Sequence, residues 1–199
     1  MSARVLAFPT RVRPILGLIR SGRRGSTPGG PGDAEAFKQL MLPHMDAAFA
    51  YARRLCRDEA VAEDLTQDAY LRAFRSFSGF RGGDAKAWLL AIVRNAFLDW
   101  ARRRGREVPG EGLDETPDPA ENAEAALVRA GEAQGLMAAV DALPGPFREA
   151  LVLRELQEMS YRQIGEITGV PIGTVMSRLA RARALLAAAL KGAAKGGGS

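Results

Sequence analysis

The sequence predicts an all-α protein made of two small helical domains joined by a flexible acidic linker. Three observations support this prediction. Apolar residues recur at helical spacing in two blocks, no stretch of useful length alternates as a β-strand does, and a Gly- and Pro-rich acidic segment separates the blocks. A chain of 199 residues can bury one medium core or two small ones. We therefore expect residues 33–106 and 125–190 to form separate domains.

The composition limits the function classes. The formal charge of +5 and the pI near 9.9 favour a polyanionic partner. A single cysteine, Cys56, and a single histidine, His44, are too few for a disulfide framework or a zinc cage, so we expect no metal and no cofactor. The longest apolar runs fall short of the about 18 residues of a spanning helix, so we expect no membrane insertion. A lone cysteine suits a reducing, cytoplasmic location.

Residues 1–32 are predicted to be a flexible basic tail. Six arginines precede the first acidic residue, Asp33. Prolines and arginines break the apolar patches, which makes the segment a poor secretory signal. An Arg-rich leader without acids also resembles an organellar presequence, and this alternative stays open.

The first domain is predicted to contain three or four helices. Residues 36–56 carry an apolar stripe, with Pro43 as a kink or boundary, and residues 58–80 begin acidic and end aromatic. The predicted stripe comprises Phe37, Leu40, Met41, Ala48, Ala52 and Leu55. Because His44 and Cys56 have no second ligand or triad partner nearby in sequence, we interpret them as a partly buried or capping residue and a small core residue.

A Gly-rich loop at 81–84 leads into the third helix, over residues 85–106. Its inward residues are predicted to be Leu89, Ile92, Val93, Ala96, Phe97 and Trp100. Arg94, Asn95 and Arg102 point away from them, and residues 86–106 contain six basic residues against one acid. This pattern predicts a positive outer face that contacts a partner. The alternative is a solvated Arg-rich helix end, which the helix dipole also favours.

The segment 107–124 is predicted to be a solvated linker. It contains seven acids, five Gly or Pro residues and no Lys or Arg. Such a segment cannot bury enough apolar surface to fold. Helical periodicity resumes near residue 125 and continues to about residue 190, ahead of a flexible tail at 191–199.

The C-terminal domain carries the pattern of a helix-turn-helix. Ser160 and Gln163 have the spacing of a capping box, and Gly169 suits the left-handed residue that ends a helix. Pro171 stands near the first turn of the following helix, and Gly165 would allow the two helices to cross closely. In this arrangement the second helix enters the major groove of DNA.

The second helix, 172–186, has two distinct faces. Val175, Leu179, Ala182 and Leu186 form an apolar stripe. Opposite the stripe lie side chains that can reach phosphates and base edges, namely Thr174, Ser177, Arg178 and Arg181. The alternative to a DNA-binding role is a purely structural one, because many pairs of helices joined by a Gly turn bind nothing.

Two motif blocks together identify a family resemblance. Residues 62–104, "AEDLTQDAYLRAFRSFSGFRGGDAKAWLLAIVRNAFLDWARRR", and residues 146–183, "PFREALVLRELQEMSYRQIGEITGVPIGTVMSRLARAR", closely resemble the extracytoplasmic-function (ECF) sigma factors of bacterial RNA polymerase. The resemblance covers about residues 34–190. It implies that the first domain is sigma region two, that the second is sigma region four, and that the protein is an alternative sigma factor directing transcription initiation.

The resemblance also implies site residues and partners. The docking site for the clamp of the largest polymerase subunit would comprise Asp64, Leu65, Gln67 and Asp68. The minus-ten element would be held by Phe80, Arg81, Lys86, Arg94, Asn95, Arg102 and Arg103, and the minus-thirty-five element by the four residues opposite the stripe of helix 172–186. The implied partners are core RNA polymerase, through its clamp and flap, promoter DNA and an anti-sigma protein.

Two other function classes compete with this interpretation. An enzyme would need paired carboxylates, a nucleophile with its base or a phosphate-binding Gly loop, and the sequence shows none of recognisable spacing. A stand-alone helix-turn-helix regulator would need a dimer interface to read two half-sites, and no heptad pattern supplies one. The resemblance also implies a departure: Met176 occupies a place that is often basic in the family, so we expect the phosphate or base contact of a basic side chain to be missing there and promoter preference to differ.

Overall fold

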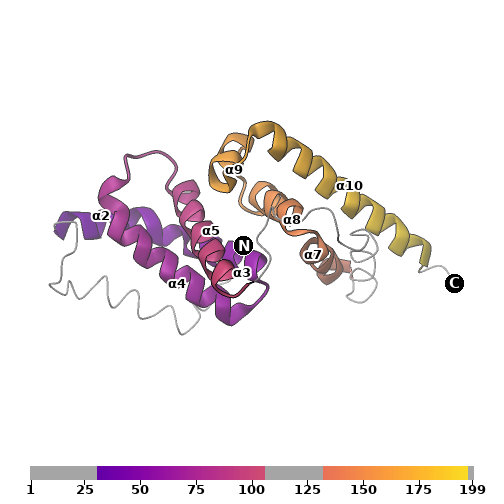
Figure 1. The fold of residues 1–199 in the computed structure, drawn as a ribbon, viewed down its shortest axis with the longest axis horizontal. Helices are drawn as coiled ribbons and strands as arrows, with labels where there is room; N and C mark the ends of the chain where they lie inside the picture. Colours follow the sequence, from indigo (N-terminus) through magenta and orange to yellow (C-terminus); the bar gives the residue numbers. More distant parts are fainter. Residues whose placement is uncertain (1–30, 106–131, 197–199) are drawn as a thin grey trace, which may run out of the picture. The chain divides into compact units, whose positions relative to one another are not determined.

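A computed structural model of the protein describes residues 31–105 and 132–196 (Figure 1). The predicted linker, 107–124, and nearly all of the predicted basic tail, 1–32, lie outside the described residues. Every regular element in the described ranges is helical, which confirms the all-α prediction. The chain folds into two compact units whose boundary lies between Phe97 and Leu98, inside helix α5. The domain limits drawn from the sequence remain predictions.

In the described part of the first unit, from residue 31 on, there are four α-helices and two short 3₁₀ turns. They are α2 (Pro31–Met41), η2 (Leu42–His44), α3 (Met45–Cys56), α4 (Glu59–Ser76), η3 (Phe77–Gly79) and α5 (Ala85–Arg103), the last of which crosses the unit boundary. Helices α3 and α4 pack against each other. Fully buried side chains, among them Phe37, Tyr51, Tyr70 and Leu89, fill the core.

Pro43 breaks the first apolar stripe, as the sequence predicts. It lies in η2 between α2 and α3, because proline has no N–H to donate and its ring clashes with the preceding turn. The carbonyl of Met41, at the end of α2, accepts a hydrogen bond of 2.7 Å from the buried hydroxyl of Tyr70 in α4. Burial raises the pKa of the Tyr70 hydroxyl. This hydrogen bond ties the end of α2 to α4 and stabilises the change of chain direction between α2 and α3.

The structure corrects three positions in the predicted apolar faces. Leu40 is 43% exposed, because Phe37 and Met41, one turn apart, already occupy the inward side of α2. Ile92 and Trp100 of α5 are only half-buried. Cys56 is buried as predicted; its Sγ donates to the carbonyl of Asp58 at 3.1 Å, and burial raises the pKa of the thiol.

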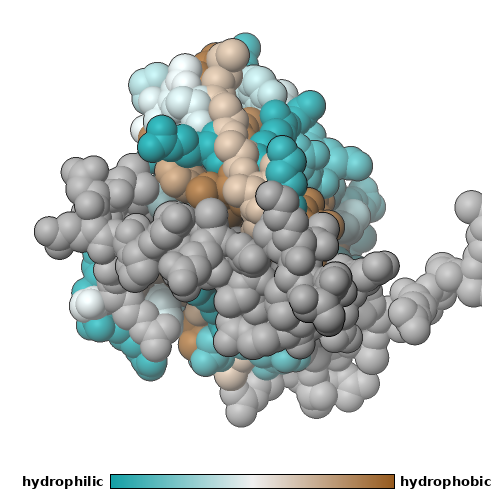
Figure 2. All heavy atoms as spheres, turned by 90° about the vertical axis from the view of Figure 1, so that its right-hand side faces the viewer, coloured by the Kyte–Doolittle hydropathy of each residue, from teal (hydrophilic) through white to brown (hydrophobic). Residues whose placement is uncertain are grey.

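The second unit contains the end of α5 and a compact set of later helices. These are α7 (Glu132–Ala142), α8 (Gly145–Leu151), the π-helical segment η4 (Val152–Leu156), α9 (Tyr161–Thr168) and α10 (Ile172–Gly196). Helix α10 packs along both α8 and α9. On the face shown in Figure 2, a hydrophobic strip lies between hydrophilic side chains.

Arg148 and Glu149 are buried in the second unit, although the sequence pattern does not indicate it. Arg148 Nη1 donates to the carbonyls of Asp141 and Leu143 at 3.2 and 2.8 Å. These carbonyls belong to the end of α7 and the residue after it, where a helix has no internal donors left. The guanidinium therefore closes the α7 terminus and fixes the turn into α8.

Helix α10 is longer than predicted. It continues to Gly196, whereas the sequence predicts a flexible tail from residue 191. Ala189 is completely buried and packs against Ala139 of α7, with Leu186 and Ala142 beside them. This contact holds the C-terminal half of α10 against α7, and the following alanines favour continuation of the helix.

Candidate nucleic-acid and docking surfaces

The first half of α4 presents an acidic surface. Asp58 caps the helix, because its carboxylate accepts from the backbone N–H of Val61 at 3.0 Å. Asp64 is exposed and forms no ion pair with any residue that the structure describes. Gln67 is half-buried one turn further on, at the spacing that places it on the same side of the helix.

The other two predicted docking residues have different surroundings. Asp68 Oδ2 lies 2.8 Å from Arg72 Nη2 on the next turn, so its charge is partly neutralised. Leu65 is only 4% exposed and belongs to the core of the unit. A direct contact from Leu65 is therefore not available in this structure, and Asp64 and Gln67 are the more accessible members of the set.

A chain of aromatic contacts leads from the core to the predicted minus-ten loop. Phe37 meets Phe77 edge to face, with ring centroids 5.3 Å apart. Phe77 stacks on Phe80 at 6.0 Å and an interplanar angle of 14°, and Phe80 contacts Trp88 of α5 at 5.1 Å. Phe80 and Trp88 are both half-buried, so each ring is anchored and keeps an accessible part. Trp88 was not predicted from the sequence, although an aromatic residue just after a Gly-rich loop was the available signal.

The loop between η3 and α5 requires glycine at two consecutive positions. Gly82 and Gly83 have φ of +86° and +96°, where an L side chain is strained. Asp84 then accepts from the backbone N–H of Ala87 at 3.0 Å and caps α5. Arg81 is exposed at the start of this loop, and Lys86 is half-buried at its end. The loop thus places one basic side chain on each side of the two glycines.

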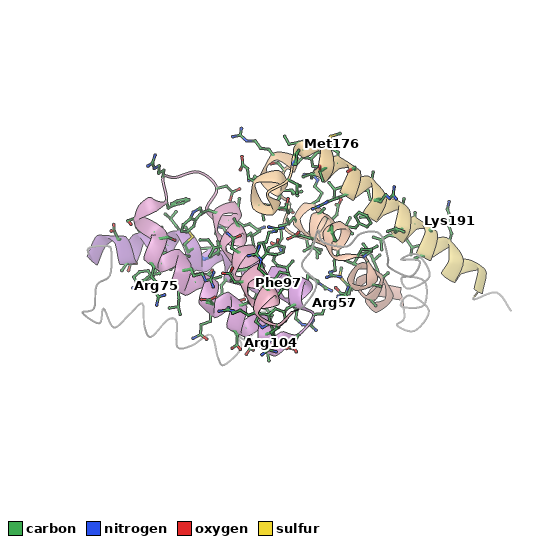
Figure 3. The ribbon with its side chains drawn as sticks, in the orientation of Figure 1. Arg57, Arg75, Phe97, Arg104, Met176 and Lys191 are labelled. Atoms are coloured by element: carbon green, nitrogen blue, oxygen red, sulfur yellow. The ribbon has the colours of Figure 1, made fainter. Side chains whose placement is uncertain are left out.

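The outer side of α5 is basic, as predicted. Asn95, Arg102 and Arg103 are exposed, and Arg94 is half-buried. Arg102 Nη1 lies 3.8 Å from Asp99 Oδ1, a distant pair that leaves most of the guanidinium accessible. Arg104 (labelled in Figure 3) is a further cation at this end of α5, and its guanidinium carbon lies 5.5 Å from the centroid of the Trp100 ring.

The two helices of the predicted helix-turn-helix, α9 and α10, begin and end near the capping and turn residues expected from the sequence. Both hydrogen bonds of the capping box are present: Ser160 Oγ accepts from the N–H of Gln163, and the Gln163 side chain accepts from the N–H of Ser160 at 2.8 Å. Gly169 ends α9 with a φ of +69°. The carbonyl of Pro171 accepts from the amides of Thr174 and Val175, which starts α10.

Gly165 has a packing role in the turn. A Cβ at this position would lie 2.9 Å from the carbonyl oxygen of Val170 and 3.9 Å from Val175 Cγ2. The close neighbour is backbone, which cannot rotate away as a side chain can. Gly165 therefore allows the turn to fold against α9. The sequence leads us to expect that this glycine allows α9 and α10 to cross closely, whereas the atom nearest to it belongs to the turn.

The two faces of α10 are separated as predicted. Val175, Leu179 and Ala182 are at most 1% exposed. On the outer side Ser177 and Arg181 are exposed, while Thr174 and Arg178 are half-buried at the flanks.

The polar groups of α10 differ in how they are engaged. Ser177 Oγ donates to the carbonyl of Thr174 at 3.0 Å. Arg181 forms no ion pair within the described part of the chain. Arg183 Nη2, by contrast, lies 2.8 Å from Glu155 Oε1 of η4. The guanidinium of Arg181 is thus the more available to a phosphate or a base.

Two other kinds of site have no candidate among the described residues. Within 31–105 and 132–196 no group of three or more His, Cys, Asp or Glu residues is arranged to hold a metal ion. No helix in these same ranges is both long enough and apolar enough to cross a membrane.

Two family models match separate parts of the chain, and the first match extends past the unit boundary at Phe97 to residue 107. Residues 40–107 match the family Sigma-70 region 2, and residues 133–186 match Sigma-70, region 4. The chain is 39% identical over 151 residues to the ECF RNA polymerase sigma factor SigE of Mycolicibacterium smegmatis, and the match covers 74% of this chain and 59% of that relative's length. It is 32% identical over 165 residues to the ECF RNA polymerase sigma-E factor of Escherichia coli K12, covering 76% of this chain and 85% of that protein.

A solved structure is similar over most of the chain. The sigma factor RpoE from Bartonella quintana, determined in complex with the anti-sigma factor NepR, matches with a TM-score of 0.62 and 33% identity. The match covers 79% of this chain and 98% of that chain. The all-helical fold thus has a counterpart among solved structures.

Proposed function

The chain belongs to the extracytoplasmic-function sigma factors, and we propose that it binds core RNA polymerase, recognises the minus-ten and minus-thirty-five elements of promoters and directs transcription initiation. In this proposal residues 33–106 act as sigma region two and residues 125–190 as sigma region four. Residues 107–124 are the tether between them, and the termini at 1–32 and 191–199 lie outside both. The protein itself carries out no chemical reaction and acts in the cytoplasm.

The observation that most directly supports DNA recognition is the outward face of α10. The inner stripe of this helix is buried, so its orientation in the unit is set by the core. The exposed Ser177 and Arg181 then lie where a second helix of a helix-turn-helix meets the major groove. Arg181 can pair with guanine, and Thr174 and Arg178 on the flanks are within reach of the backbone.

We assign the minus-ten element to the Gly82–Gly83 loop, α5 and the adjoining aromatic rings. Melted DNA exposes bases that stack on aromatic side chains, while cations follow its backbone. Phe80 and Trp88 supply anchored rings, and Arg81 and Lys86 flank the loop. The predicted contacts Arg94, Asn95, Arg102 and Arg103 would continue this basic surface along α5.

We assign polymerase docking to Asp64 and Gln67 of α4, with Asp68 contributing less because Arg72 already pairs with it. Leu65 supports the helix from inside. We further propose that an anti-sigma protein holds the factor inactive. This proposal draws on the similar Bartonella sigma factor, which was solved in complex with an anti-sigma factor.

A reconstitution experiment tests the proposed function. The full chain is mixed with fluorescent duplexes from a promoter library, with and without core polymerase, and retained DNA is sequenced. We expect specific retention and run-off transcripts only when the core enzyme is present. Specific binding by the chain alone, in a dimer that spans two half-sites, would instead favour a stand-alone regulator.

Arg181→Ala is expected to weaken promoter binding by the reconstituted holoenzyme by about 1–3 kcal/mol and to relax preference at one base pair, if Arg181 makes a bidentate contact with guanine. A phosphate contact would weaken all sequences alike and lower the salt slope by about one. Competition binding against all single-base variants of the minus-thirty-five element distinguishes these contacts. Lys191→Ala, which removes an exposed cation further along the same helix (Figure 3), is the matched control and should leave base preference unchanged.

A further inference from the structure

Two large apolar side chains are exposed at the start of α10. Ile172 is 49% exposed and Met176 is 54% exposed. They are four residues apart, so they lie on the same side of the first two turns. Figure 3 shows Met176 at this end of the helix, pointing away from the other helices of its unit. Neither belongs to the buried stripe of Val175 and Leu179, and the described part of the chain leaves both accessible.

We propose that Ile172 and Met176 recognise thymine in the minus-thirty-five element by contacting its C5-methyl group. The inference rests on the proposed function, in which α10 enters the major groove. The residues at the N-terminal end of a recognition helix contact base edges, and these two lie on its first two turns. In the major groove the methyl group of thymine is the apolar feature available to such side chains.

The chemistry of this side of α10 favours an apolar contact over a charged one. The side chain of Met176 has no N–H or O–H to donate to a phosphate or a base, but its flexible thioether adapts to an irregular apolar surface. Arg183, two turns further along this side, is paired with Glu155 at 2.8 Å. The side of α10 with Ile172 and Met176 therefore presents apolar atoms. The adjoining side, with Ser177 and Arg181, presents polar atoms.

The lack of a side chain at Gly173 is consistent with a close approach of DNA to the first turn of α10. A Cβ added there would meet no protein atom within 4 Å, so packing inside the chain does not require a glycine. Without a side chain at this position, the first turn of α10 can lie near the base edges between Ile172 and the flank of Ser177. Gly173→Ala should raise the melting temperature, because alanine is the better helix former, and yet weaken promoter binding.

The decisive experiment replaces thymine by deoxyuridine, which lacks only the methyl group. Holoenzyme reconstituted from the full chain and core polymerase first selects its promoter from a random library. Each thymine of the selected minus-thirty-five element is then replaced in turn. We expect about a fourfold loss of affinity at one or two positions, the effect of leaving one methyl group unburied.

Met176→Ala should weaken binding to the thymine duplex and remove the difference between thymine and deoxyuridine at its position. Ile172→Ala should do the same at a neighbouring position. Leu190→Ala, which shortens a 48% exposed leucine near the other end of α10, is the matched control and should keep the full difference. Met176→Lys should remove the difference while increasing the salt dependence of binding by about one phosphate contact.

Three results would overturn the inference while the proposed function stands. The first is a selected minus-thirty-five element that contains no thymine. The second is an affinity of the natural holoenzyme that does not change when thymine is replaced by deoxyuridine. The third is a Met176→Ala variant that keeps the full difference in affinity between thymine and deoxyuridine. A Met176→Ala variant that loses affinity for core polymerase and keeps the thymine preference would show that this side meets a protein instead. Failure of the natural chain to initiate from any selected promoter would contradict the proposed function itself.

Discussion

The double variant Asp64→Lys, Gln67→Lys is expected to bind core polymerase at least about tenfold more weakly than the natural chain and to lose most promoter-dependent transcription. It changes the charge of the proposed docking surface by three units, from acidic to basic, and like charges that face each other across an interface suppress binding. Lysine is a good helix former, Asp64 is exposed and Gln67 is half-buried, so α4 should stay folded. Titration of the labelled chain with core enzyme measures the affinity, and circular dichroism checks the helices.

Glu59→Lys is a suitable control for the double variant. Glu59 is exposed on the same helix but five residues before Asp64, on a different side. Its reversal should change core affinity less than about twofold, apart from a small cost to the helix terminus. Equal core affinity for the natural and doubly substituted chains would remove the docking assignment from α4.

Gly165→Val is expected to destabilise the second unit by about 3 kcal/mol, which in a unit of this size lowers the melting temperature by more than about 10 °C. The reason is the carbonyl oxygen of Val170, which would lie 2.9 Å from the new Cβ. Relief of that clash requires the turn between α9 and α10 to open. Promoter recognition should fall with stability, because the turn sets the angle of α10.

Gly173→Val is the matched control for this prediction. It introduces the same side chain on the same helix pair, where a Cβ meets nothing within 4 Å, so the melting temperature should change little. Hydrogen exchange of the α9 and α10 amides reports on this unit separately from the first. Similar protection in the two variants would show that the 2.9 Å approach is relieved without cost.

The local features of the fold were predictable because their causes are local. Pro43 ends a helix wherever it stands after the first turn, and the Ser160–Gln163 spacing allows a capping box whatever packs on the other side. Gly169 was predictable for the same reason, since its left-handed conformation is a property of one residue. The inward face of α10 was also correct, because the helical period alone places Val175 and Leu179 together.

Contacts between distant residues were not predictable in the same way. The helical period assigned Leu40 to the inward face, and the family resemblance assigned Leu65 to a docking surface. Only the neighbouring helices decided that Leu40 is exposed and that Leu65 is buried. The burial of Arg148 depends on where α7 ends, because its guanidinium must meet carbonyls five and seven residues away in a turn.

The family, the helical class and the order of the two motif blocks follow from the chain alone, because motif spacing and helical period are properties of neighbouring residues. Which polar groups remain available to partners was decided by the tertiary structure. Arg181 and Arg183 are equivalent in sequence, two arginines in one basic run, yet only Arg183 is paired with Glu155, 28 residues away. An ion pair over that separation forms when packing of α10 brings the two side chains together, and no local pattern encodes it.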